Sequence, residues 1–359
     1  MSFDLSELGW NAERQEQLDQ LGDARLEPAR VAVEHRGSYR ILTAAGELAG
    51  LVPGKMSYDA ATREDLPAVG DWIAVERVDK ESAVVRAILD RRSSFVRKTA
   101  GFEANAQVVA ANVDIVFIVD PFDRGPNLRR IERYLTVGWE SGATPTVVLT
   151  KSDLGFDVGE DLVKVMDIAP GVEVHAVSVV TGDGLEGLSR YLDGAPTIAV
   201  LGPSGAGKSS LINALMGRVV MEAKEVRIDG KGRHTTTHRE LIPLPGGGAL
   251  IDTPGMRELQ LYDGDDGIDQ SFSDIYALAE LCRFRDCAHN GEPGCAVAGA
   301  VATGDLDEAR FESYRKQLRE LAAVARRKDV RLAREEAKKW GRIHRDVMAR
   351  SKARGRTNH

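Results

Sequence analysis

The spacing of apolar residues changes twice along the chain and divides it into regions. The first residues have an acidic, helical pattern. From about Arg30, apolar and polar residues alternate, and glycine-marked turns interrupt the alternation, which is typical of short strands. This pattern predicts a small closed β-barrel, for which an OB-fold is a candidate. The stretch DRRSSFVRK (90–98) is predicted to be a basic linker that leaves the barrel.

After the linker, nearly continuous apolar runs alternate with helix-like stretches. VDIVFIVD (113–120) is a nearly continuous apolar run, as expected for a parallel strand that is buried on both sides, and TPTVVLT (144–150) is predicted to be another buried strand. Further strands are predicted at 172–178, 197–202 and 247–255. The alternation predicts an α/β fold, a mostly parallel sheet with helices on both faces. After about residue 270 the pattern becomes helical and ends in a charged tail.

Composition and charge limit the number of domains, the class of protein and its expected partners. The 359 residues suit two or three domains, and contents of 43% hydrophobic and 29% charged residues are those of an ordinary soluble protein. We expect no membrane span and, because a secretory signal is not recognisable, a cytoplasmic location. The net charge is −7, yet the segment from Arg326 to Arg356 holds 13 Lys and Arg against 4 Asp and Glu. Such a tail suggests contact with phosphates, with a solvated helix end as the alternative.

The stretch GPSGAGKSS (202–210) matches the phosphate-binding pattern G-x-x-x-x-G-K-[ST] and lies between an apolar strand and a helix. Backbone N–H groups of such a loop and the following helix N-terminus surround phosphates. We expect Lys208 to reach the β- and γ-phosphates and to act in catalysis, and Ser209 to ligate Mg²⁺. The residues expected to bind nucleotide here are Gly202, Pro203, Ser204, Gly205, Ala206, Gly207, Lys208, Ser209 and Ser210.

Two later stretches complete the predicted phosphate side of the site. LIDTPG places Asp252 at the end of an apolar strand, where it can hold Mg²⁺ through water, and Gly255 can turn its N–H toward a γ-phosphate. GKGRHTTTHRE (230–240) suits a switch loop that closes over the Mg²⁺ ion and the γ-phosphate, with a plain surface loop as the alternative. Thr235 and Thr236 are the candidates in this loop for contact with the nucleotide, and the sequence alone does not choose between them. Of the two, Thr236 is the residue that we assign to Mg²⁺ and to catalysis.

The stretch VVLTKSDLG (147–155) contains TKSD, which looks like a guanine-reading signature. Asp153 can accept hydrogen bonds from guanine N1–H and the exocyclic amine, whereas adenine would leave this carboxylate unpaired. The apolar stem of Lys151 can lie along the base. At the next strand end, a backbone N–H near Ser178 and Val179 can meet guanine O6. The predicted base-binding residues are Thr150, Lys151, Ser152, Asp153, Ser178 and Val179.

All three cysteines of the chain lie in one short window with a histidine, as Cys282-x₄-Cys287-x-His289-x₅-Cys295. An odd number of closely spaced cysteines, without a secretion signal, argues against disulfides and for a metal. Three thiolates and one imidazole make a closed, structural zinc site. The alternative is three buried thiols and a surface histidine.

The motif order TKSD, SVV, GPSGAGKSS, GRHTTT, DTPG is that of circularly permuted GTPases. Together with PAVGDWIAV in the barrel and the cysteine cluster, the chain resembles the small ribosomal subunit-dependent GTPase A family, from about residue 30 to about residue 320. The domains so predicted are an N-terminal helical segment (1–28), an OB-fold barrel (29–98), a circularly permuted GTPase domain (99–270) and a zinc-binding helical domain with a basic tail (271–359).

The resemblance implies that GTP is hydrolysed to GDP with Mg²⁺, that the small ribosomal subunit and its rRNA are the partners, and that hydrolysis serves late subunit maturation. We expect a monomer. Two departures from many GTPases affect the mechanism. Thr150 stands where many have Asn, so selectivity for guanine should rest mainly on Asp153. Met256 stands where many have Gln, so His234, or a ribosomal group, is the candidate that positions the attacking water.

Two other functions stay open at this point. A P-loop kinase acting on a small substrate would explain GPSGAGKSS and Asp252, but neither TKSD nor the cysteine cluster. An RNA-binding module with a structural nucleotide site is the third possibility.

Overall fold

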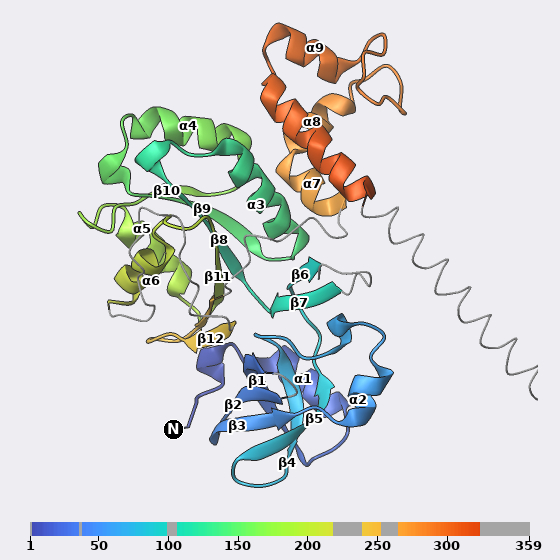
Figure 1. The fold of residues 1–359 in the computed structure, drawn as a ribbon, viewed down its shortest axis with the longest axis vertical. Coiled ribbons are helices and arrows are strands. Elements are labelled where there is room, and N and C mark those ends of the chain that lie inside the picture. The colour runs from blue at the N-terminus through green and yellow to red at the C-terminus, as the bar shows by residue number, and fades with distance from the viewer. Residues whose placement is uncertain (1, 36–37, 99–105, 218–238, 253–264, 324–359) are drawn as a thin grey trace, which may run out of the picture.

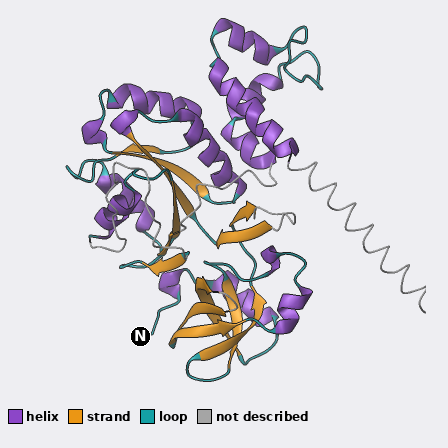
Figure 2. Cartoon of the chain, in the orientation of Figure 1, coloured by secondary structure: helices purple, strands orange, loops and turns teal. Residues whose placement is uncertain are grey.

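A computed structural model describes residues 2–35, 38–98, 106–217, 239–252 and 265–323. It has an N-terminal barrel, a central sheet with helices, and a group of C-terminal helices (Figures 1 and 2). The predicted fold class is confirmed in each of these parts. The predicted domain boundaries themselves stay a prediction. None of the described helices has the length and hydropathy that crossing a bilayer requires.

The barrel is built from five strands that close on themselves. They are β1 (Leu26–His35), β2 (Ser38–Thr43), β3 (Gly46–Leu51), β4 (Trp72–Arg77) and β5 (Ser82–Ile88). Their order is β1-β2-β3-β5-β4, and β4 pairs back with β1. Only β3 and β5 are parallel within this group. Closure removes free sheet edges, and fully buried Ile41, Ile73 and Val85 fill the interior. Helix α2 (Gly54–Asp59) lies between β3 and β4.

The segment that follows the barrel corrects one expectation. Residues 94–98 are not a linker: β6 (Ser94–Lys98) pairs antiparallel with β7 (Ala106–Ala111). The physical reason lies in two apolar residues within the basic stretch. Phe95 is buried, and Val96 packs against a small cluster that includes Val108. Burial of these side chains outweighs the polar character of their neighbours.

Six strands form the central sheet in the order β10-β9-β8-β11-β13-β12. They are β8 (Ile115–Pro121), β9 (Thr144–Thr150), β10 (Val174–Ala176), β11 (Thr197–Leu201), β12 (Glu240–Pro243) and β13 (Ala249–Asp252). Every pairing from β10 to β13 is parallel, and β12 is antiparallel to β13. The sequence patterns predicted all of these strands except β12.

Helices cover both faces of the central sheet, as the apolar side chains on both faces of β8 require. They are α3 (Leu128–Glu140), α4 (Val158–Ile168), α5 (Leu185–Ser189) and α6 (Lys208–Met216). Val116 and Ile118 belong to the core cluster that includes α3 and α4, whereas Phe117 and Val119 belong to the one that includes α5 and α6. All four side chains are fully buried. The apolar run of β8 therefore supplies both halves of the core.

The barrel and the central sheet are joined by β12, which pairs with β1 where Val33 faces Glu240. The N-terminal segment, with a 3₁₀ turn (Ser6–Leu8) and α1 (Ala12–Gln20), packs at this junction. Buried Arg30 of β1 donates hydrogen bonds to the Leu8 carbonyl and, at 2.6 Å, to Thr197 Oγ1 of β11. The Gly248 N–H donates to the Glu7 carbonyl at 2.6 Å. Residues 5–20 thus contact both parts.

The C-terminal helices are anchored on α3 through a buried arginine. These helices are α7 (Asp265–Ser271), α8 (Ser273–Ala279), α9 (Ala296–Thr303) and a helix over residues 308–323. Arg310 Nη2 lies 2.6 Å from Asp274 Oδ1, and its Nη1 lies 3.1 Å from Oε1 of Glu132 in α3. Arg310 and Glu132 are both buried, so this pairing is needed to offset their desolvation.

Candidate functional site

The phosphate-binding loop predicted from the sequence connects β11 to α6 at the carboxyl edge of the parallel strands. Gly202 follows β11 with φ +151°, and a Cβ placed there would lie 2.3 Å from the Val119 carbonyl oxygen. Only glycine fits such a close approach. Gly207, at φ +84°, immediately precedes α6. Ser209 and Ser210 are in the first turn of this helix, whose N–H groups and dipole favour an anion.

Lys208 closes over the loop that it follows. Its Nζ donates to the carbonyl oxygens of Gly202 at 2.9 Å and of Pro203 at 2.7 Å. These two bonds keep the ammonium group beside the backbone of the loop. A positive charge and a helix N-terminus therefore meet at the same place, which is the chemistry that a phosphate chain requires.

The base-reading stretch touches the phosphate-binding loop directly. Thr150, the last residue of β9, is 1% exposed, and its Oγ1 donates to the Ala206 carbonyl oxygen at 2.5 Å. The two motifs lie far apart in the sequence, and the motif that normally comes later in a GTPase comes first here. This bond shows that both motifs nevertheless belong to one site.

Lys151 and Ser152 form the turn that follows β9. Lys151 adopts a left-handed conformation, with φ +59° and ψ +40°, and its Nζ lies 2.7 Å from Asp123 Oδ2. The Ser152 N–H donates to the Val177 carbonyl at 3.1 Å. Asp123 was not predicted as a site residue. It lies 28 positions away, and no local pattern marks it.

Asp153 and Ser178 meet at the outer rim of the same edge. The Ser178 hydroxyl is buried and donates to Asp153 Oδ1 at 2.6 Å. It also accepts hydrogen bonds from the N–H groups of Val180 and Thr181, at 3.2 and 3.1 Å. One hydroxyl therefore fixes the carboxylate against the turn after β10, while Asp153 itself is exposed. Val179, beside Ser178 in that turn, is half-buried.

Some predicted residues fall outside what the structure describes. His234, Thr235, Thr236, Gly255 and Met256 lie outside the described residues, as does the basic tail from Arg326 to Arg356. Asp252 ends β13, and in this strand Ile251 pairs with Ala199 of β11. The backbone at the end of β13 therefore runs beside the strand that carries the phosphate-binding loop.

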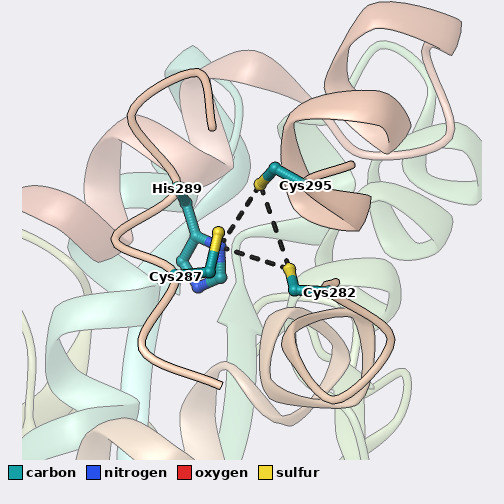
Figure 3. Close-up of side chains that lie close together, drawn as sticks. All are labelled: Cys282, Cys287, His289 and Cys295. Carbon is teal, nitrogen blue, oxygen red and sulfur yellow. Dashed lines mark hydrogen bonds between the residues drawn. The ribbon is translucent and has the colours of Figure 1, made fainter. Parts of the chain in front are cut away.

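The four predicted metal ligands come together in the C-terminal helices (Figure 3). The ligand atoms of Cys282, Cys287, His289 and Cys295 all lie within 4.8 Å of one another. His289 Nδ1 lies 3.6 Å from Cys282 Sγ and 3.4 Å from Cys295 Sγ, and the two sulfurs are 4.0 Å apart. Tetrahedral zinc with bonds of about 2.0 to 2.3 Å requires ligand separations of roughly 3.5 to 3.8 Å. The cluster is therefore compatible with zinc.

Local structure explains why this cluster forms. Cys295 caps α9, and its Sγ accepts from the Ala298 N–H at 3.3 Å. Cys282 Sγ accepts from the Ala296 N–H, also at 3.3 Å. The intervening loop turns through glycines at 291 and 294, both with positive φ, and through His289 at φ +58°. These hydrogen bonds orient the two sulfurs toward the cluster.

Together, the strand order and the joined motifs define a circularly permuted P-loop GTPase. In the chain, β9 and β10, which lead into TKSD and Ser178, precede β11 and the loop at 202–210, and the link from residue 193 to residue 197 joins the two halves. The comparisons with known proteins make the assignment more specific. The chain belongs to the RsgA GTPase family, a family of GTP hydrolases, and the family match covers residues 88–262. The resemblance inferred from the motifs is thereby confirmed.

One relative is the small ribosomal subunit biogenesis GTPase RsgA of Opitutus terrae, which is 44% identical over 98% of this chain and 99% of its own length. Among solved structures, YjeQ from Thermotoga maritima matches with a TM-score of 0.63 and 26% identity, over 83% of this chain and 99% of that one. YloQ, described as a circularly permuted GTPase, matches in fold with a TM-score of 0.60 and 22% identity, over 84% of this chain and 96% of that one.

Proposed function

We propose that this protein is a small ribosomal subunit biogenesis GTPase whose turnover of GTP is stimulated by the subunit. The proposal that the protein binds a guanine nucleotide rests on the hydrogen bond from Thr150 to the Ala206 carbonyl, because this bond brings a guanine-reading motif and a phosphate-binding loop together in one site. The name of the Opitutus terrae relative supports the ribosomal part. A P-loop kinase would need neither the Asp153–Ser178 pair nor the cysteine cluster, so that alternative is not favoured.

Within this proposal each side of the site has its own task. Asp153 reads the guanine edge, Lys151 lies along the base, and the backbone near Ser178 and Val179 meets O6. Lys208 and the loop N–H groups hold the phosphates. Mg²⁺ would neutralise charge on the β- and γ-phosphate oxygens, and its proposed ligands are Ser209, Thr236 and Asp252. Thr235, Thr236 and Gly255 are proposed to close over the γ-phosphate.

A structural zinc ion is proposed at the Cys282, Cys287, His289 and Cys295 cluster. Three thiolates and one imidazole fill a tetrahedral shell, so the ion would hold the loop to α9 rather than bind substrate. The C-terminal helices would then form a fixed unit on α3 through Arg310. A cytoplasmic, monomeric protein that contacts rRNA through its barrel and basic tail completes the proposal; the barrel's part rests on fold analogy alone.

Co-sedimentation with purified ribosomal subunits tests the ribosomal part. We expect the protein to pellet with small subunits in the presence of a non-hydrolysable GTP analogue, and less so with GDP, because the γ-phosphate would order the switch loop. Large subunits are the control and should pellet little of the protein. Equal pelleting with both subunits, independent of nucleotide, would contradict a specific ribosomal role.

His234 is proposed to position the attacking water, because a neutral imidazole can accept a water proton and Met256 cannot. His234→Ala should remove most subunit-stimulated turnover, about 100-fold or more, while affinity for GDP stays near wild type. Release of phosphate measured with saturating small subunits provides the comparison. Stimulated turnover at the wild-type rate would rule this role out and point to a ribosomal group.

A further inference from the structure

We propose that Thr150 is a positioning residue for the phosphate-binding loop and takes no part in choosing the base. Its position in TKSD assigns it to guanine recognition, but its contacts lie elsewhere. The side chain is 1% exposed, and Oγ1 donates to the Ala206 carbonyl at 2.5 Å. A threonine hydroxyl has a single proton to donate. Because that proton is engaged with the loop, it is not available to O6 or N7 of a purine.

The Ala206 carbonyl matters because of what is attached to it. The carbonyl oxygen of Ala206 and the N–H of Gly207 belong to one planar trans peptide unit and point in opposite directions. When Thr150 holds the oxygen toward β9, the Gly207 N–H is turned the other way, away from β9. Gly207 is the residue just before α6, at φ +84°, a position where loops of this kind direct N–H groups at phosphate.

Packing around this peptide supports the same role. Ala206 is fully buried in the core cluster that also holds Leu211 of α6. A Cβ at Gly207 would lie 3.6 Å from Thr150 Oγ1, so the loop is seated directly on this side chain. Gly207 has no side chain to restrict its backbone, and the hydrogen bond from Thr150 supplies a restraint on the peptide before it.

Asp153 provides the contrast within the same motif. It is exposed at the rim and fixed by Ser178, so it can meet the edge of a base. The two residues therefore act on different parts of one ligand: Asp153 on the base and Thr150, through the loop, on the phosphates. Loss of the Thr150 hydroxyl should weaken every nucleotide by the same factor, whatever its base. This inference rests on the proposed function, since it assigns a role within the proposed nucleotide site.

The test compares the dissociation constants of GDP and of 7-deaza-2-aminopurine riboside diphosphate, which lacks the O6 and N7 acceptors and the N1–H. Thr150→Val keeps the shape of the side chain and removes the hydroxyl, and we expect about 10-fold weaker binding of both nucleotides, with their ratio unchanged. Thr150→Ser keeps the hydroxyl and should bind both within about 3-fold of wild type. Asp153→Asn is the comparator and should change the ratio.

Three results would overturn the inference. One is a loss in Thr150→Val that falls on GDP alone, and another is wild-type affinity for both nucleotides in that variant. If Thr150→Val fails to fold, Thr150→Ala decides the matter, because it also removes the hydroxyl and adds no new donor. An equal loss for both nucleotides in Thr150→Ala supports positioning, and a loss that falls on GDP alone contradicts it. Failure of the wild-type protein to bind any guanine nucleotide would instead remove the proposed function itself.

Discussion

Replacing Asp153 by Asn is expected to weaken GDP binding on the order of 100-fold and to make XDP the better ligand. The carboxylate can accept hydrogen bonds from guanine N1–H and the 2-amino group. An amide presents its own N–H₂ there, which faces guanine donors but suits the 2-oxo group of xanthine. Ser178 holds Asp153 Oδ1 at 2.6 Å, so the substituted group is kept in the same place.

Titration of wild type and variant with fluorescent GDP and XDP measures this change in base preference. Asp161→Asn is a matched control, because it removes the same charge from α4, where Asp161 pairs with Lys164 at 3.4 Å. The control should bind GDP as wild type does. An Asp153→Asn variant that keeps full affinity for GDP and gains none for XDP would show that the base is read elsewhere.

Removing zinc is expected to unfold the loop around the cysteine cluster while leaving nucleotide binding in place. Structural zinc contributes about 10 to 16 kcal/mol of binding free energy in zinc-finger peptides, which is comparable to the stability of a whole domain. Cys295 both belongs to the cluster and caps α9, so Cys295→Ser should lose the ion and loosen the start of this helix. The nucleotide site lies on the central sheet, so affinity for GDP should stay within about 3-fold.

Metal content and limited proteolysis check this prediction. Wild type should contain one zinc per chain and resist cleavage between residues 280 and 296, and Cys295→Ser should contain little zinc and be cut there. Asp286→Asn is the control, because Asp286 is exposed in the same loop and outside the four-residue cluster. A wild-type protein without zinc, or a zinc-free variant equally resistant to cleavage, would refute a structural ion.

Sequence reasoning succeeded where local chemistry determines the outcome. β9 spans the predicted 144–150, because its apolar centre VVL is flanked by threonines, which also favour strands, and turn residues lie before and after it. The turn between β11 and α6 was located from glycine positions that the backbone demands, as the close approach of Gly202 to Val119 illustrates. The four residues of the metal cluster were found from spacing and donor type, which fix how a short loop can converge.

Sequence reasoning failed where a partner lies far away in the chain. β12 has only four residues and is stabilised by β13 and by β1 of the barrel, neither of which a local pattern can indicate. The strand β6 was mistaken for a linker because basic residues surround its two apolar side chains, the buried Phe95 and the partly buried Val96. The hydrogen bond from Thr150 to the Ala206 carbonyl likewise joins residues 56 positions apart, so the sequence alone does not indicate it.

We propose that the permuted order of motifs still assembles one guanine-specific site that the small ribosomal subunit activates. Phosphate release from GTP and from ATP, each with and without small subunits, tests this most directly. We expect slow phosphate release from GTP alone, strong stimulation by small subunits, and little release from ATP under either condition. Equal turnover of GTP and ATP, or turnover of GTP that small subunits leave unchanged, would contradict it.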